Sequence, residues 1–181
     1  MAEQIAVRVA GPNDASAVET VLRASYSELM ASAYPEDVLA RALPLLVRAN
    51  PALLRSGTYY VAEGIDGTVV GCGGWTFERP GAPDAPTEPG LGHIRHFATD
   101  PGWLRRGVGR ALFDRCAADA WAAGVQRFEC YSSLVAEPFY RALGFVAVEP
   151  MTIDMGSGIA LPSIRMTCSL ASYRYAADPS G

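Results

Sequence analysis

The chain has 181 residues, of which 50% are hydrophobic and 19% are charged, and its formal net charge at pH 7 is -4. This composition is typical of a globular protein with a sizeable core, and it excludes a disordered chain. A net negative charge argues against a nucleic-acid partner, and no apolar run reaches the roughly 18 residues that a membrane span needs.

Hydrophobic periodicity and turn signals divide the chain into strands and helices. Their order is strand-helix-helix, then three strands, then helix-strand-helix-strand-strand, which is typical of an α/β protein with helices on a mixed sheet. In chain order we expect a strand over 5–9, a helix from a cap at Asn13 or Asp14 to about 30, a helix from 35 to about 50, strands over 58–62, 68–77 and 91–99, a helix over 110–123, a strand over 126–131, a helix over 135–143, and strands over 145–148 and 163–170.

Proline and glycine mark the irregular segments. Pro44 inside the second helix predicts a kink or a break, and Asn50-Pro51 is expected to end that helix or restart it. Residues 78–90 are rich in proline and glycine and predict a surface loop, which is either a cover over an active site or a solvated hairpin loop. We expect a turn-rich connection over residues 151–161 and a frayed tail over residues 176–181.

The stretch over residues 93–116 carries the clearest functional signal. A strand pattern ends at Asp100-Pro101, and a turn with Gly107 and Gly109 then leads into a helix. The first turn of a helix offers free N–H groups and a positive dipole end, and glycine lets a backbone approach an anion closely. The turn is therefore predicted to bind a phosphate group, although many helices follow glycine for structural reasons alone. Three arginines add positive charge suited to phosphate oxygens: Arg105, Arg106 and Arg110.

This stretch and a second one resemble the GNAT superfamily of N-acetyltransferases. The family's pyrophosphate loop reads Gln/Arg-x-x-Gly-x-Gly/Ala, and residues 104–109 read Leu-Arg-Arg-Gly-Val-Gly, so that Leu104 replaces the usual Gln or Arg. Residues 136–145, Ala-Glu-Pro-Phe-Tyr-Arg-Ala-Leu-Gly-Phe, look like the family's A-x-x-F/L-Y-x-x-x-G-F block. The resemblance implies a single domain over residues 1–181 with a three-layer α/β fold, in which helices flank a central mixed, mostly antiparallel sheet.

The same resemblance implies acetyl-CoA as the acetyl donor. The family holds the pyrophosphate on the basic turn and runs the pantetheine arm along the preceding strand, where it pairs with backbone groups. Ser133 stands where the family often has an asparagine that bonds this arm, and Ser132 is its neighbour. The residues implied for the two contacts are Arg105, Arg106, Gly107, Val108, Gly109 and Arg110 for the pyrophosphate, and Phe97, Ala98 and Thr99 for the arm.

Tyr140 and His93 are the expected catalytic residues. The resemblance places Tyr140 near the cofactor sulfur, where a phenol can protonate a thiolate; the alternative is a half-buried core tyrosine. His93 stands where many family members carry a glutamate, and a neutral imidazole is a suitable base near pH 7; the alternative is a packed histidine. Strand alternation directs His96 to the other face, so we prefer His93, with Glu129 and Glu88 as fallback bases.

The acceptor is expected to be the primary amine of a small molecule. Two alternatives remain open, namely a transferase acting on a protein N-terminus or lysine, and a non-catalytic acyl-CoA-binding module. The resemblance makes a homodimer plausible. Four aromatic residues either form an apolar acceptor wall or belong to the core: Tyr26, Tyr34, Trp75 and Phe77.

The cysteines are widely spaced and form no Cys-x-x-Cys or Cys/His cluster, so we expect no metal site. The N-terminal segment is too short and too interrupted for a signal peptide, and we therefore expect a cytoplasmic protein without membrane or nucleic-acid partners. Four buried, reduced thiols are predicted: Cys72, Cys116, Cys130 and Cys168.

Overall fold

A computed structural model of the protein describes residues 5–177, with side chains up to residue 173. Its described strands form one seven-stranded sheet in the order β1-β2-β3-β4-β5-β7-β6. All neighbouring strands are antiparallel except β4 and β5, which confirms the mixed, mostly antiparallel sheet. The strands are β1 (Ala6–Val9), β2 (Tyr59–Glu63), β3 (Val69–Thr76), β4 (Leu91–Thr99), β5 (Arg127–Ser133), β6 (Val146–Asp154) and β7 (Ala160–Ser169).

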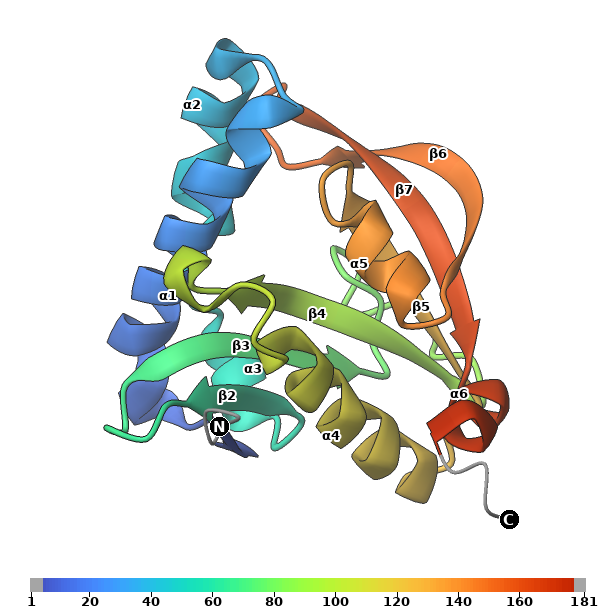
Figure 1. Ribbon diagram of the computed structural model, residues 1–181. Coiled ribbons are helices and arrows are strands. Elements are labelled where there is room, and N and C mark those ends of the chain that lie inside the picture. Colours follow the sequence, from blue (N-terminus) through green and yellow to red (C-terminus); the bar gives the residue numbers. More distant parts are fainter. Residues whose placement is uncertain (1–4, 178–181) are drawn as a thin grey trace.

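Helices cover both faces of the sheet and give the expected three layers (Figure 1). Helix α1 packs on one face, where Val21 and Leu22 meet Val61 and Cys72 of the sheet. Helix α4 packs on the opposite face. None of the described helices is long and apolar enough to cross a membrane. The helices are α1 (Ala15–Leu29), α2 (Glu36–Leu46), α3 (Pro51–Arg55), α4 (Val108–Ala122), α5 (Glu137–Ala142) and α6 (Leu170–Ala177), with short 3-10 turns η1 (Pro12–Asp14), η2 (Met30–Ser32) and η3 (Pro101–Trp103).

Strands β4 and β5 separate soon after they begin. They pair in parallel over three residue pairs, of which His93 with Glu129 is the last. Beyond it, β4 continues to Thr99 and β5 to Ser133 without pairing to each other in the described chain. The sheet therefore has a gap between its two parallel strands, and α5, which follows β5, lies beside it (Figure 1).

A bulge interrupts β4 where it faces β3. The pairing shifts register between Cys72 and Gly74, and His96 opposite them has a φ of 43°, a conformation that few non-glycine residues adopt. Ile94 and Phe97, three residues apart, both pack on the core under α4. Strict alternation therefore fails along this strand, so alternation cannot be used to place His96 on the face opposite to His93.

Strands β6 and β7 form a hairpin where we expected a turn-rich connection, so that expectation for residues 151–161 is wrong. The turn is confined to residues 155–159, closed by a bond from Met155 N–H to Ile159 O of 2.9 Å. Pro150 is tolerated because β6 lies at the edge of the sheet, and Pro162 because β7 pairs with β5 only from Ser163 onward.

Three smaller expectations also change. Helix α2 runs through Pro44, which lies in its last turn, so the chain does not break there. Asp14 occupies the position before α1, but its carboxylate accepts from Gly11 N–H and pairs with Arg8 instead of capping the helix. Helix α6 was not predicted, and it includes residues 176 and 177 of the expected tail; residues 178–181 lie outside the described residues.

Other expectations are confirmed. Asn50 restarts the chain as α3, because its side chain accepts hydrogen bonds from the N–H groups of Ala52 and Leu53. The four cysteines are buried free thiols, as predicted.

Candidate active site

The basic turn forms the N-terminal end of α4. Gly107 immediately precedes the helix with a φ of 84°, and Arg105 also has a positive φ of 61°. The first bond of the helix runs from Ala111 N–H to Gly107 O at 2.9 Å. The N–H groups of residues 107–110 consequently have no acceptor within the helix and project from its positive end, as an anion site requires.

The side chains of the turn differ in their freedom to reach a ligand. Arg105 is exposed, whereas the Arg106 guanidinium lies over the Trp103 ring, 5.2 Å from its centroid. Arg110 donates to the carbonyl oxygen of Ala142 at 3.2 Å. Val108 is buried and can offer only its backbone.

The two glycines of the turn have different surroundings. A Cβ at Gly107 would have nothing within 4 Å, so its positive φ is what favours glycine there. A Cβ at Gly109 would lie 2.7 Å from the Phe139 ring of α5. The second glycine therefore has a packing role in bringing α4 close to α5.

The end of β4 borders the gap. Asp100 N–H donates to Val70 O at 2.9 Å, so residues of the same parity, including Ala98, direct their backbone groups to β3. Phe97 and Thr99 direct theirs into the gap, where the Tyr26 hydroxyl donates to Phe97 O at 3.2 Å. The backbone that could pair with a pantetheine arm is that of Phe97 and Thr99 more than that of Ala98.

Two serines lie at the far end of β5. Ser132 is buried, and its hydroxyl donates to the carbonyl oxygen of Ser133 at 2.8 Å. Ser133 is half-buried, and its own hydroxyl has no partner in the described chain. Nearby, the Tyr34 hydroxyl accepts from Leu134 N–H at 2.9 Å and donates to Pro162 O at 2.8 Å. Ser133 thus keeps a free hydroxyl at the β5 end of the gap.

Tyr140 lies beside the gap, on α5. Its ring packs against Phe97 with centroids 6.5 Å apart and against Phe139 at 5.1 Å. Only 6% of the residue is exposed, and burial raises the pKa of its phenol well above the usual value. Its hydroxyl has no hydrogen-bond partner within residues 5–177, and Tyr26 from the α1 side is near enough to affect its pKa. Tyr140 therefore stays protonated at pH 7 and is available as a donor.

His93 lies where the gap begins, on the face of the sheet opposite α4. It is 4% exposed, and its Nδ1 is 3.6 Å from Glu129 Oε1. Burial, aided by the charges of Arg79 and Arg95, lowers the pKa of His93, while Glu129 opposes that change. His93 is consequently neutral at pH 7 and able to accept a proton.

The two fallback bases differ in position. Glu129 is partly buried beside His93, whereas Glu88 is more than half exposed and forms an ion pair with Arg127. Glu88 therefore faces solvent, with its charge already balanced.

Of the two alternatives for the four aromatic residues, the core alternative holds for Trp75. It is fully buried on the α4 face with Phe128. The sequence-based prediction missed Arg95, a half-buried residue whose guanidinium donates to Thr76 Oγ1 at 3.0 Å. Its spacing of two residues from His93 on a strand was the signal that could have found it.

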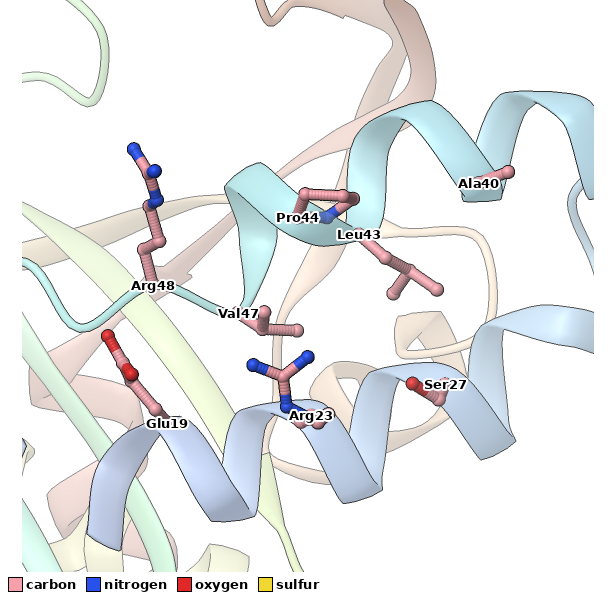
Figure 2. Close-up of a pocket in the computed structure, with 8 residues that line it drawn as sticks. All are labelled: Glu19, Arg23, Ser27, Ala40, Leu43, Pro44, Val47 and Arg48. Atoms are coloured by element: carbon pink, nitrogen blue, oxygen red, sulfur yellow. The ribbon is translucent and has the colours of Figure 1, made fainter. Parts of the chain in front are cut away.

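A separate hollow of about 410 Å³ lies between α1 and α2. Figure 2 shows that Arg23 and Leu43 project into it from opposite helices. None of the residues predicted for the site lines this hollow, so we assign it no part in the reaction. Its lining consists of Glu19, Arg23, Ser27, Ala40, Leu43, Pro44, Val47 and Arg48.

Comparisons with known proteins point to one family. Residues 23–145 match the model of the acetyltransferase (GNAT) family. No curated protein matches the chain.

Solved structures share the fold. The chain is similar to the GCN5-related N-acetyltransferase "Aminotransferase, Class-II" from Rhodopseudomonas palustris, with a TM-score of 0.70 and 24% identity over 93% of this chain and 98% of that one. It is also similar to the PaiA N-acetyltransferase from Thermoplasma acidophilum in complex with coenzyme A, with a TM-score of 0.68 and 15% identity over 92% and 99%. A Mycobacterium tuberculosis protein in complex with CoA and NLQ gives a TM-score of 0.58 and 23% identity over 91% and 98%.

Proposed function

Because the chain belongs to the GNAT family of acetyltransferases, we propose that it transfers the acetyl group of acetyl-CoA to the primary amine of a small molecule. The observation that carries this proposal is the gap between β4 and β5. The N-terminus of α4 lies near one end of β4, Tyr140 borders the gap from one face of the sheet, and His93 lies on the other face where the gap begins.

The residues present suit acetyl-CoA. The projecting N–H groups of residues 107–110 and the exposed Arg105 match a pyrophosphate in charge, and the backbone of Phe97 and Thr99 that faces the gap matches an amide-bearing arm. When bound, acetyl-CoA supplies an acetyl group already activated as a thioester. The free hydroxyl of Ser133 can add one hydrogen bond.

The chain's own residues then have to manage protons. His93 accepts the proton that the amine nitrogen loses as the new C–N bond forms. The Tyr140 hydroxyl gives the proton that the sulfur takes up as the C–S bond breaks. The protons balance when the one on His93 returns to the Tyr140 oxygen through solvent. Holding the two reactants in one orientation supplies much of the remaining rate.

The charges near His93 favour a small acceptor over a protein. The carboxylates near His93 are paired with arginines, Glu129 and Glu149 with Arg165 and Glu88 with Arg127, so these described residues form no free acidic strip for a lysine-containing peptide. Tyr34 ties the segment between α1 and α2 to the ends of β5 and β7, which limits access for a chain. Both features support a small amine.

Thermal unfolding with acetyl-CoA, with ATP and NAD as controls, tests the cofactor. A ligand at 100 times its Kd adds about 2.7 kcal/mol, which for a chain of this size raises Tm by roughly 5 to 10 °C. An increase with acetyl-CoA alone supports the donor site, and a screen of amines for released thiol then tests the acceptor. No increase would remove the donor site from the proposal.

Replacing Tyr140 with phenylalanine separates an enzyme from a binding module. Because its hydroxyl has no partner in the described part of the chain, Y140F should fold and bind acetyl-CoA normally while kcat falls about 100-fold. Tyr60→Phe is the matched control, since its hydroxyl bonds Asp119 at 2.7 Å in the core under α4. An unchanged kcat in Y140F would contradict the role of Tyr140 as the acid.

We also propose that residues 1–181 act as one domain, that the protein forms a homodimer, and that it works in the cytoplasm. The four buried free thiols suit a reducing compartment. Light scattering on a size-exclusion column measures the mass directly, and a monomer at assay concentration would contradict the dimer.

A further inference from the structure

His93 and Glu129 are directly opposite each other on neighbouring strands. They form the last parallel pair before β4 and β5 separate. Their side chains lie on the same face of the sheet, and Nδ1 of His93 is 3.6 Å from Oε1 of Glu129. That distance is too long for a hydrogen bond, but a small movement would bring it to the usual 2.9 Å or so.

The polar atoms of the two partners are held differently. Nδ1 of His93 is buried and has no hydrogen-bond partner in the described chain. The other ring nitrogen, Nε2, does not belong to the buried atoms that lack a partner there. Oε2 of Glu129 accepts from Arg165 at 3.1 Å, and the Nε of Arg165 donates to Glu149 at 2.9 Å. Glu129 is therefore held from β7, and its remaining oxygen is directed to His93.

We propose that Glu129 is a positioning residue for the acetyl transfer, which holds His93 in the orientation and charge state that a base requires. This inference rests on the proposed function. When the amine proton moves to Nε2, the Nδ1–H of the imidazolium donates to Oε1 of Glu129, so that the new positive charge forms beside a fixed carboxylate. Arg165 keeps that carboxylate from turning away.

The other charges around His93 do not replace Glu129. Arg95 on β4 and Arg79 in the loop before it disfavour a proton on the ring, as does burial. Glu88 in the same loop favours one, but it is exposed and paired with Arg127. Glu129 is the carboxylate that opposes these effects at close range.

The alternative is that Glu129 only joins β5 to β7 through Arg165. Glu149 offers a matched control for this reading, because it bonds the same arginine but does not contact His93. E129Q and E149Q each remove one negative charge from Arg165. A structural role would make their effects similar, whereas a positioning role would separate them.

The first measurement is the NMR titration of His93. The chain has two histidines, so H96N leaves His93 as the single imidazole signal. In the H96N background, E129Q should move the titration of His93 to lower pH, while E149Q should leave it nearly in place. An unchanged titration in E129Q would overturn the proposal, whether or not the chain acetylates an amine.

The second measurement is the pH profile of kcat/KM. The acid limb should move to lower pH in E129Q, with kcat about tenfold lower and KM for acetyl-CoA unchanged, and E149Q should match the parent. Equal losses in E129Q and E149Q would overturn the proposal. If acetyl-CoA raised Tm but no amine released thiol, the proposed function would fail. The His93 titration would still test the interaction between His93 and Glu129 independently.

Discussion

Gly109 provides the sharpest test of how the phosphate turn is built. The motif suggests that both glycines serve the ligand, but in the structure Gly109 serves the contact between α4 and α5. An alanine there would place a Cβ 2.7 Å from one carbon of the Phe139 ring and 2.9 Å from another. Ordinary carbon contacts are about 3.5 to 4.0 Å, so the ring or the helix has to move.

The ring cannot move without consequences. Its centroid is 6.3 Å from that of Phe97 and 5.1 Å from that of Tyr140. Overpacking of this kind costs about 1 to 3 kcal/mol, and the better helix propensity of alanine returns up to about 1 kcal/mol. We expect G109A to lose about 1 to 2 kcal/mol in its free energy of unfolding. For a chain of this size that lowers Tm by about 2 to 8 °C.

A double-mutant cycle measured by urea or thermal unfolding isolates the contact. In an F139A background, where the ring is absent, G109A should cost nothing or stabilise slightly. G107A is the control, since its cost of about 1 to 2 kcal/mol arises from its positive φ and should be equal in both backgrounds. If G109A were equally costly with and without the Phe139 ring, the assignment of Gly109 to packing would be refuted.

Three further predictions concern other parts of the molecule. Burial lowers the pKa of His96 to about 4, so the unfolded chain takes up a proton below pH 6.5 that the folded chain takes up only near pH 4. The free energy of unfolding, measured by urea denaturation, should therefore fall by at most about 3 kcal/mol as the pH falls through this window. H96N, in which asparagine suits the positive φ, should lack that part of the fall. The same pH dependence in H96N as in the parent would contradict the reasoning. Burial raises the pKa of all four thiols, to about 12 for Cys72, so iodoacetamide at pH 8 should label none of them in the native protein and all of them in urea, as counted by mass spectrometry. N50A should lower the free energy of unfolding by about 1 kcal/mol in thermal unfolding, because α3 loses its cap. If N50A lost no more stability than a substitution of the exposed Glu36, the cap would be unimportant.

Local signals in the sequence were sufficient for most elements. The spacing of apolar residues predicts α1 and α4, and Asn50 predicts the restart at α3, because capping and periodicity depend on neighbours within a few residues. The basic turn and the block around Tyr140 indicated the family for the same reason. Each is a continuous stretch whose residue types have a direct chemical meaning.

Only the tertiary structure decided how distant stretches meet. The bulge at His96 depends on the register of β3 against β4, which no local pattern along β4 reveals. The hairpin of β6 and β7 tolerates Pro150 because that strand has a partner on one side alone, a fact about the sheet and not about the residue.

The same distinction applies to the site. The sequence by itself determined that a helix begins after a basic, glycine-bearing turn, and that His93, Glu129 and Tyr140 are present. The structure placed His93 against Glu129 and Gly109 against Phe139. These contacts join residues 30 or more positions apart, and they follow from strand register and helix packing, which form only when the whole chain folds.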